Sequence, residues 1–392
     1  MSGAGARGAQ PAVDLAVSRR RIDEIDRQIV DLFEQRMRVV SDVADYKRAT
    51  GKAVYDRERE RQKVAQAVEW ADEEYARFIP PLFELIMEMS RSSQHTLLQD
   101  GGCPDLRVAD AAHRGDLPQG ARVCCQGVEG AYSHIAACEI MADPAVSFCA
   151  SWSDVCDAVE AGDADFGVLP LENSTAGTVN RVYGLLSERG LYIVSSLTLR
   201  IDHNLLAKPG CRLADVREVY SHEQALRQCE DFIASLPGGV RASVADNTAM
   251  AARAVAESDR SDVAAISSSK CAELYGLDVL AHAVQDEKDN FTRFICVARD
   301  PWLVAGAERS SFLLVLPHEP GSLYRVLARI AALNVNMLKL ESRPIPGKRF
   351  EFMFYVDVAS VPGDDAFSEL VSQVAPLCDR FCYLGSYREQ SR

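Results

Sequence analysis

The chain has 392 residues and a mass of 43.0 kDa, so we expect two to four domains rather than one core. Its 47% hydrophobic and 26% charged residues are typical of a soluble globular protein, and no apolar run is long enough to span a bilayer. The net charge is −14 and the basic run is short, Arg19-Arg20-Arg21, which argues against a nucleic-acid partner. We expect a cytoplasmic protein.

Residues 1–17 are predicted to form a loose tail, because they are rich in glycine and alanine and lack the apolar core of a signal peptide. The twelve cysteines are scattered along the chain and none forms a Cys-x-x-Cys pair. We therefore expect buried, reduced thiols, with neither a disulfide nor a metal site.

A long helix is predicted from Ser18 to Ala49, and its apolar stripe is interrupted by Arg36. Lys47 lies eleven residues further on, about 16 Å along the axis and on nearly the same face. Two cations in one interior suggest a pocket for a small dianion. The alternative, equally favoured by spacing alone, is a coiled-coil seam with a snorkelling arginine and an exposed lysine. The apolar positions of the stripe are Ile22, Ile25, Ile29, Leu32, Val39 and Val43.

Two more helices complete the first region. Asp56 is placed to cap the second helix, and Pro80 and Pro81 lie at the start of a third, from Leu82 to about Gln99. Three helices of this kind cannot bury their apolar faces alone, so we expect a homo-oligomer, at least a dimer. Residues 100–120 are rich in glycine and proline without periodicity and are predicted to be a linker.

The second region alternates strands and helices, which predicts an α/β sheet that binds ligands near the carboxyl ends of its strands. Its predicted helices begin at Ser133 and include 224–233 and 247–256. Its predicted strands are 122–125, 168–171, 192–199, 218–220, 263–266 and 294–297.

The third region follows residues 301–309 and is predicted to have the ferredoxin-like order βαββαβ. Gly347 lies between two of its strands, as a hairpin requires. The predicted pieces are 312–316, 321–333, 336–343, 349–358, 364–374 and 381–386.

The first region, across about 80 residues, resembles the all-helical chorismate mutases, which are intertwined dimers of three-helix chains. The motifs that carry the resemblance are Arg19-x-x-Ile-Asp-x-Ile-Asp, Arg36, Lys47, Asp56-x-x-Arg59-Glu60 and Ser90-x-x-x-Gln94. Taken singly, Arg19 reads as a solvated helix start, Asp56 as a plain cap, and Ser90 with Gln94 as a polar helix face.

The resemblance implies that these side chains bind chorismate. Arg36 and Arg19 would clamp carboxylates, because a guanidinium makes two charged hydrogen bonds at once. Lys47 and Gln94 would donate to the ether oxygen on which negative charge grows. The remaining carboxylate and the ring hydroxyl would be held by Asp56, Arg59, Glu60 and Ser90.

Helix geometry adds a constraint on Arg19. It lies seventeen residues before Arg36, which is about 25 Å along a straight helix. Two arginine side chains cannot span that distance to one small molecule. Arg19 is therefore predicted to serve a site made with the other protomer.

The second region, over some 180 residues, resembles prephenate dehydratases, whose fold has two α/β lobes similar to periplasmic binding proteins. We expect one lobe over 121–200 and 285–300, and the other over 201–284. The motifs behind the resemblance are Gly127-Val-Glu-Gly-Ala-Tyr-Ser133-His134, Pro170-Leu-Glu172-Asn173-Ser174, Tyr220-Ser221-His222 and Asn290-Phe-Thr292-Arg293-Phe294.

By this resemblance, Thr292 donates the proton to the departing ring hydroxyl of prephenate, without a metal or redox cofactor. A free hydroxyl is a poor acid, so a relay or polarisation by Arg293, Asn173 or Glu172 is expected. Read alone, Thr-Arg-Phe is ordinary strand sequence and Glu-Asn-Ser a helix cap. The predicted prephenate-binding residues are Ser133, Glu172, Asn173, Ser174, Ser221, Arg293 and Phe294.

The third region, residues 310–392, resembles an ACT domain, an amino-acid-sensing module whose effector in these enzymes is phenylalanine. Gly321 would let a carboxylate approach the free N–H groups at a helix N-terminus. The alternative is a dimerisation module with a vestigial pocket. The residues expected to bind phenylalanine are Gly321, Ser322, Leu323, Glu341, Ser342 and Arg343.

Together the three resemblances predict a multidomain, bifunctional enzyme that makes prephenate from chorismate and phenylpyruvate from prephenate, inhibited by phenylalanine. Two alternatives stay open at this point. One activity has decayed, or the chain is a binding and sensing protein without turnover. The complete polar sets around Lys47 and Thr292 favour catalysis.

Overall fold

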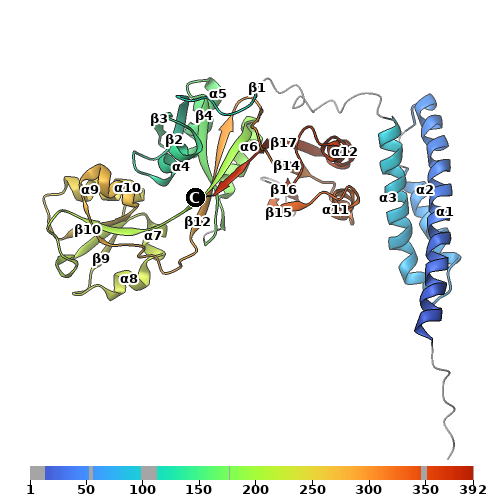
Figure 1. Cartoon of the computed structure of the whole chain (residues 1–392), viewed down its shortest axis with the longest axis horizontal. Coiled ribbons are helices and arrows are strands. Elements are labelled where there is room, and N and C mark those ends of the chain that lie inside the picture. Colours follow the sequence, from blue (N-terminus) through green and yellow to red (C-terminus); the bar gives the residue numbers. More distant parts are fainter. Residues whose placement is uncertain (1–13, 53–55, 99–112, 176, 346–350, 392) are drawn as a thin grey trace, which may run out of the picture. The chain divides into compact units, whose positions relative to one another are not determined.

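The computed structural model describes residues 14–52, 56–98, 113–175, 177–345 and 351–391. The chain divides into two compact units, residues 1–103 and 104–392 (Figure 1). Among the described residues, no helix has both the length and the apolar character that a membrane crossing requires.

The first unit consists of helices α1 (Leu15–Thr50), α2 (Arg57–Glu69) and α3 (Ile79–Leu98), with a 3₁₀ turn η1 (Ala76–Phe78) before α3. Helix α1 begins three residues earlier than predicted, so Leu15–Val17 belong to the helix and not to the tail. The reason is Asp14, whose side chain accepts hydrogen bonds from the backbone N–H groups of Ala16 and Val17.

Local sequence explains the other helix ends. Gly51 adopts a left-handed φ of 67°, which ends α1. The Asp56 side chain accepts a hydrogen bond from the Arg59 backbone N–H at 3.1 Å and caps α2, as predicted. Pro80 and Pro81 lie in the first turn of α3, where a missing N–H breaks no helical hydrogen bond.

Helix α3 packs against both α1 and α2. Residues 19–32 of α1 are all exposed. The apolar stripe is exposed with them: Ile22, Ile25, Ile29 and Leu32 have exposed fractions of 55%, 50%, 58% and 63%. Burial within α1 is confined to Val40 and Ala44 among the described residues.

The second unit begins with a seven-stranded sheet, which we call lobe 1. Its strand order is β18-β6-β12-β4-β2-β3, with β5 paired to β4. Helix α4 packs on one face, and α5 and α6 pack on the other. The elements are β2 (Arg122–Gln126), α4 (Tyr132–Ile140), β3 (Ala145–Cys149), α5 (Trp152–Ala161), β4 (Phe166–Asn173), β5 (Gly177–Thr178), α6 (Asn180–Arg189), β6 (Tyr192–Arg200), β12 (Phe291–Ala298) and β18 (Glu389–Ser391).

Lobe 2 is a five-stranded sheet of order β11-β7-β10-β8-β9. The chain enters it through residues 201–203 and leaves it through 282–290. The two crossings are hydrogen-bonded to each other, because the Val284 N–H donates to the His203 carbonyl at 2.8 Å. The elements are β7 (Asn204–Ala207), η2 (Leu213–Asp215), β8 (Glu218–Ser221), α7 (Glu223–Arg227), α8 (Glu230–Ser235), β9 (Arg241–Val244), α9 (Thr248–Glu257), β10 (Val263–Ser267), α10 (Ser269–Tyr275) and β11 (Asp278–Ala281).

One predicted helix of lobe 2 is wrong. Residues 224–233 form two short helices, α7 and α8, that are interrupted at Gln228 and Cys229. The Gln228 carbonyl accepts a hydrogen bond from the Asp286 N–H at 2.8 Å, and Cys229 has non-helical dihedral angles. A contact with the returning crossing therefore replaces the helical hydrogen bond at this point.

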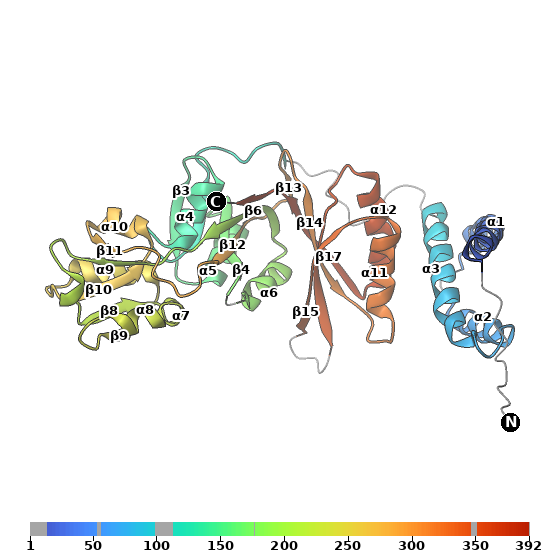
Figure 2. The same cartoon turned by 60° about the horizontal axis from the view of Figure 1, so that its bottom comes forward.

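The third part of the chain follows the order strand, helix, strand, strand, helix, strand, and its sheet has the order β15-β16-β14-β17. Helices α11 and α12 cover one face (Figure 2). The predicted hairpin at Gly347 lies outside the described residues. The elements are β14 (Arg309–Val315), α11 (Ser322–Ala332), β15 (Met337–Pro344), β16 (Phe352–Val358), α12 (Asp365–Val374), η3 (Ala375–Leu377) and β17 (Arg380–Tyr387).

The other face of this sheet packs directly on lobe 1. Leu313, Tyr355, Leu384 and Tyr387 belong to the same buried cluster as side chains of α5, α6, β4 and β12. Close approach is possible because Gly385, at a φ of 132°, carries no Cβ. A Cβ there would overlap the backbone carbonyl of β6. The C-terminal sheet therefore shares one core with strands β4 and β12 of lobe 1.

Two short pairings were not predicted. The C-terminal strand β18 joins lobe 1 beside β6, and β1 (His113–Arg114) pairs with β13 (Trp302–Leu303). Strand β1 falls within the predicted linker 100–120, so that prediction is wrong for its last part. Strands of two or three residues carry no periodicity that a sequence reading can detect.

The expectation that all cysteines are reduced is wrong for one pair. Cys124 and Cys149 form a disulfide between the adjacent strands β2 and β3. The strand register places Cys124 opposite Ser147, so Cys149 lies two residues on and on the same face, with 6.8 Å between the cysteine Cα atoms. Nine cysteines are free among the described residues, and burial raises the pKa of Cys125 to about 12.

Candidate active sites

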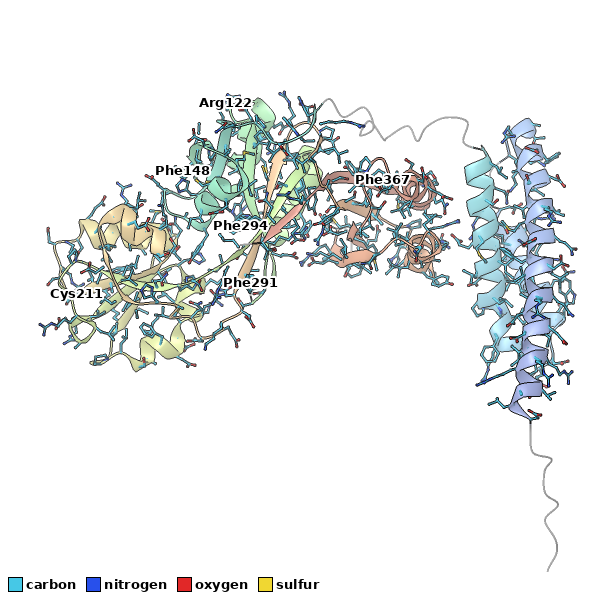
Figure 3. The ribbon with its side chains drawn as sticks, in the orientation of Figure 1. Arg122, Phe148, Cys211, Phe291, Phe294 and Phe367 are labelled. Atoms are coloured by element: carbon cyan, nitrogen blue, oxygen red, sulfur yellow. A yellow bond between two sulfur atoms is a disulfide. The ribbon has the colours of Figure 1, made fainter. Side chains whose placement is uncertain are left out.

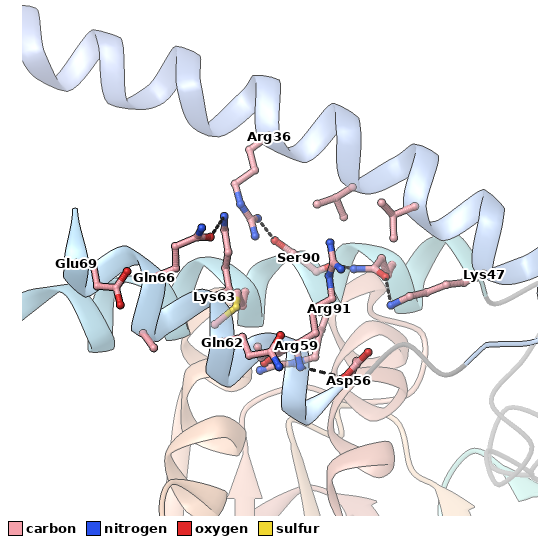
Figure 4. Close-up of a pocket in the computed structure, with 16 residues that line it drawn as sticks. Arg36, Lys47, Asp56, Arg59, Gln62, Lys63, Gln66, Glu69, Ser90 and Arg91 are labelled. Atoms are coloured by element: carbon pink, nitrogen blue, oxygen red, sulfur yellow. Dashed lines mark hydrogen bonds and ion pairs between the residues drawn. The ribbon is translucent and has the colours of Figure 1, made fainter. Parts of the chain in front are cut away.

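A cavity of about 700 Å³ lies between the three helices of the first unit (Figure 4). It gathers side chains from the second half of α1, the exposed side of α2 and the middle of α3. The predicted residues that line it are Arg36, Lys47, Asp56, Arg59, Glu60, Ser90 and Gln94.

Two hydrogen bonds across the cavity hold its cations. Arg36 Nη1 donates to Ser90 Oγ, and Lys47 Nζ donates to Gln94 Oε1 at 3.0 Å. Burial lowers the pKa of Arg36. Burial also lowers the pKa of Lys47, although the nearby carboxylates of Asp56 and Glu60 act in the opposite direction. Both shifts mean that the protein pays to keep positive charge here, and a bound anion would relieve that cost.

Arg91 is a further lining residue that the sequence reading missed. Its side chain is 8% exposed and forms ion pairs with Glu60 and Glu88. Burial acts to lower the pKa of Arg91, but the hydrogen bonds and charges of Glu60 and Glu88 outweigh it and raise the pKa. The sequence shows no sign of this role, because it depends on Glu60 of another helix.

Arg19 is exposed and does not line the cavity of its own chain. Helix α1 is continuous from Leu15 to Thr50, so the separation of about 25 Å from Arg36 along the axis applies. The single chain therefore brings together all of the predicted helical set except this arginine.

The second candidate site lies where lobe 1 meets the crossings. Strands β4 and β12 pair with Asn173 directly opposite Thr292, and Thr292 is 9% exposed. Asn173 Nδ2 donates a hydrogen bond to Thr292 Oγ1 at 2.9 Å. Because Oγ1 accepts this bond, the hydroxyl proton of Thr292 is directed elsewhere and can be donated to a ligand.

A ring of hydrogen bonds fixes the Asn173 amide. Asn173 Nδ2 donates to Asn290 Oδ1 at 2.8 Å, and Asn290 Nδ2 donates to Gln228 Oε1 at 3.2 Å. Gln228 Nε2 donates to Thr175 Oγ1 at 2.7 Å, and Thr175 Oγ1 donates to Asn173 Oδ1 at 2.8 Å. Gln228 belongs to lobe 2, so the ring joins the two lobes.

Sequence reasoning missed Gln228 because it was assigned to a helix interior. The structure places it at the break between α7 and α8. His203 Nε2 lies 3.0 Å from Gln228 Oε1, and burial lowers the pKa of His203. A neutral imidazole with its proton on Nε2 satisfies this contact.

A family model for chorismate mutase type II matches residues 18–95, and a family model for prephenate dehydratase matches residues 123–301. A bifunctional chorismate mutase/prephenate dehydratase of Escherichia coli (strain K12) is 31% identical over 386 residues, covering 96% of this chain and 97% of the relative. The chain belongs to the bifunctional chorismate mutase/prephenate dehydratase family.

Two solved structures are similar to the dehydratase part of this family member. A prephenate dehydratase from Arthrobacter aurescens, in complex with L-Phe, is 27% identical with a TM-score of 0.61, covering 68% of this chain and 89% of that one. GqqA, described as a novel type of quorum quenching acylase, is 32% identical with a TM-score of 0.62, covering 68% of this chain and 98% of that one.

The structure does not bring Arg293 to Thr292, although the two are adjacent in the dehydratase motif. Successive residues of a strand point to opposite faces, and Arg293 points into the contact with the C-terminal sheet. Its guanidinium donates to Glu172 and Asp357, each at 3.1 Å, and to the Tyr387 hydroxyl at 2.7 Å. Burial acts to lower the pKa of Arg293, but Tyr387 and the surrounding carboxylates raise it.

Glu172 also lies on that opposite face and is separated from Thr292. Lys339 on β15 pairs with it, and burial, which would raise the pKa of Glu172, is outweighed by the hydrogen bond and charge of Lys339. Lys339 lies 3.1 Å from Glu341, which in turn pairs with Arg343. Of the three candidates for polarising Thr292, Asn173 is the residue in contact with it, and Glu172 and Arg293 lie on the opposite face.

The other residues predicted to bind prephenate are spread over both lobes. Ser174 Oγ donates to the Asp289 carbonyl at 2.7 Å, and Ser221 Oγ donates to the Ile266 carbonyl at 2.6 Å while fully buried. Phe294 is 3% exposed within the core of lobe 1 (Figure 3). Ser133 is buried in the first turn of α4. Ser174, Ser221 and Phe294 thus have structural contacts that account for them.

The predicted effector residues divide between two faces of the C-terminal sheet. Gly321 precedes α11 with a φ of 84°, and no atom lies within 4 Å of a Cβ built there. Ser322 is buried, and Ser342 is exposed on the edge strand β15. Glu341 and Arg343 alternate with Ser342 and belong to the ion pairs beside lobe 1. No group of side chains in the described ranges is arranged to hold a metal ion.

Proposed function

We propose that the two units catalyse successive reactions of phenylalanine synthesis. The helical unit rearranges chorismate to prephenate, and the two-lobed domain converts prephenate to phenylpyruvate. The observation that carries the first assignment is the cationic cavity around Arg36 and Lys47. The hydrogen bond from Asn173 to Thr292 carries the second. The cytoplasmic location stays a prediction.

The mutase reaction needs no nucleophile or proton transfer, because it is a unimolecular rearrangement. The site must hold a dicarboxylate in a compact conformation and stabilise negative charge on the ether oxygen. Arg36, held by Ser90, binds a carboxylate. Lys47 and one N–H of Gln94 donate to the ether oxygen, while the other N–H of that amide donates to the Ser90 carbonyl at 3.2 Å.

A second copy of the chain completes this site in our proposal. The exposed stripe from Ile22 to Leu32 needs an apolar partner, and Arg19 extends from the same exposed half of α1. Two antiparallel copies of α1 would bury both stripes and bring the partner's Arg19 toward the second carboxylate. The enzyme is therefore a homodimer at least.

In the dehydratase reaction the ring hydroxyl leaves as water while the ring carboxylate leaves as carbon dioxide, and the released electron pair completes the aromatic ring. Thr292 supplies the proton to the departing hydroxyl. Asn173 keeps Thr292 Oγ1 as an acceptor, which orients that proton. Gln228 closes the lobes and orients Asn173 through the ring of hydrogen bonds.

Phenylalanine inhibits this enzyme by binding to the C-terminal domain, which we assign as an ACT domain. The L-Phe complex of the Arthrobacter aurescens prephenate dehydratase supports this effector. Gly321 leaves the N-terminus of α11 accessible to a carboxylate, and Ser342 is the exposed hydroxyl of the edge strand. Glu341 and Arg343 would respond through their ion pairs.

Two separate assays test the proposed function. One follows consumption of chorismate, and the other follows formation of phenylpyruvate from added prephenate. Turnover in both is expected. Turnover in one alone would mean that the other activity has decayed, and turnover in neither would leave a binding protein.

A further inference from the structure

A second cavity, of about 620 Å³, lies between α6 of lobe 1 and strands β15 and β16 of the C-terminal sheet. This volume is in the range of small-molecule sites, roughly 300–1,000 Å³. Leu185, Met353 and Tyr355 supply an apolar surface. None of the residues placed in the two active sites lines this cavity.

Positive charge predominates around this cavity, which is lined by Arg181, Arg189 and Arg343 against the carboxylate of Glu188. Arg189 already pairs with two acidic residues of α5. In the part of the chain that the structure describes, Arg181 has no ion-pair partner, and the buried Nε of Arg343 has no hydrogen-bond partner. An apolar surface beside an arginine without an ion-pair partner suits an apolar molecule that carries one carboxylate.

We propose that this cavity binds an aromatic monocarboxylate, the chemical class of phenylpyruvate. The inference rests on the proposed dehydratase function, because that reaction makes such a compound. An amino acid would fit less well, because Glu188 is the one carboxylate in the lining against three arginines, so the added ammonium group would meet mostly positive charge. The cavity would therefore let the enzyme sense its own product at a place separate from the reacting groups.

A chain of ion pairs links this cavity to the catalytic strand β4. Arg343 pairs with Glu341, Glu341 with Lys339, and Lys339 with Glu172, which precedes Asn173 in sequence. A carboxylate bound to Arg343 would compete with Glu341 for the guanidinium. Glu341 would then hold Lys339 more strongly, and Lys339 would hold Glu172 less strongly. A ligand bound in the cavity would thus weaken the ion pair of Glu172, at the end of β4 that carries Asn173.

A substitution of Gly184 can fill this cavity. Gly184 lies on α6 in the lining, and a Cβ built there meets a single atom within 4 Å, Glu188 Oε1 at 4.0 Å. Gly184→Leu would therefore occupy the cavity without straining the helix, and Gly184→Ala would leave most of it open. Leucine and alanine both favour a helix over glycine, so both variants should fold.

The test is product inhibition of the full-length enzyme with prephenate as substrate and phenylpyruvate as inhibitor. Binding at the active site gives a competitive component, and binding in the cavity adds a non-competitive one. We expect both components in the wild type and in Gly184→Ala. Gly184→Leu should keep the competitive component and weaken the other at least about tenfold, and Arg181→Gln should weaken it about threefold to tenfold.

Three outcomes would overturn the proposal. Purely competitive inhibition in the wild type, or a non-competitive component unchanged in Gly184→Leu, would show that phenylpyruvate does not act here. Loss of L-phenylalanine inhibition in Gly184→Leu would assign the cavity to the amino acid instead. An absence of dehydratase turnover in the wild type is a different result, because it would refute the proposed function itself.

Discussion

The two active sites differ in how much of each site one chain supplies. In the helical unit, half of α1 is exposed together with its apolar stripe, and Arg19 lies outside the cavity. In the α/β unit, Thr292, Asn173 and Gln228 are already joined by hydrogen bonds within one chain. In our proposal a second copy of the chain completes the first site, whereas the second site is formed by the two lobes of one chain. The difference predicts that the two activities respond to different changes.

The largest expected effect is the loss of mutase activity in Lys47→Ala. Removing the cation that donates to the ether oxygen should lower kcat by about 10³-fold, because this charge acts in the transition state. Dehydratase turnover of added prephenate should stay unchanged. Arg38→Ala, which alters an exposed side chain of the same helix, is the matched control and should change neither rate. Loss of both activities in folded Lys47→Ala enzyme would contradict separate sites.

Thr292→Val should have the converse effect. Replacing the hydroxyl by a methyl group removes the proposed proton donor, so dehydratase kcat should fall about 10²–10³-fold, while mutase activity persists. Thr292→Ser keeps a hydroxyl within reach of Asn173 and should retain much more of the activity. Near-normal formation of phenylpyruvate by Thr292→Val would remove Thr292 from the mechanism.

Arg293→Met tests the opposite face of the same strand. It leaves the buried carboxylate of Asp357 without one of its cations, and Glu172 and Glu389 lose a partner as well. We expect a loss of about 3–5 kcal/mol in the free energy of unfolding, which thermal denaturation would show as a lower Tm. Arg122→Met removes an exposed ion pair and should lower the Tm much less. Equal effects of the two variants would refute a structural role for Arg293.

Ser342→Ala should have the smallest effect. A lost hydrogen bond to phenylalanine should raise the concentration needed for half-maximal inhibition about threefold to tenfold. Turnover without phenylalanine should not change, because Ser342 is exposed on the edge strand away from Thr292. Unaltered inhibition would place the effector elsewhere.

The two regions also differ in how far the sequence predicts them. Helical spacing identified Arg36 and Lys47 correctly as neighbours of one cavity, because a helix keeps its face over many residues. In a strand, successive side chains point to opposite faces of the sheet. Thr292 and Arg293 therefore lie on different faces, and so do Glu172 and Asn173. The sequence motifs alone therefore do not show which of two neighbouring residues contacts Thr292.

Other features depended on contacts between distant segments. Gln228 acquires its role because a hydrogen bond with Asp286 interrupts its helix. Strand β18 is too short to show a pattern, and it is defined by its pairing with β6. Arg91 looks like a surface residue until Glu60 and Glu88 are brought to it. Single-sequence patterns contain no information about which distant partner will be present.

Subunit mixing tests most directly whether a second copy completes the mutase site. Arg19→Ala and Lys47→Ala enzymes, each inactive as a mutase, would be mixed under conditions that exchange subunits. If Arg19 serves the site of its partner, half of the dimers will be mixed and each will contain one intact site, restoring about a quarter of wild-type activity. A mixture that exchanges subunits and stays as inactive as its parents would contradict the account.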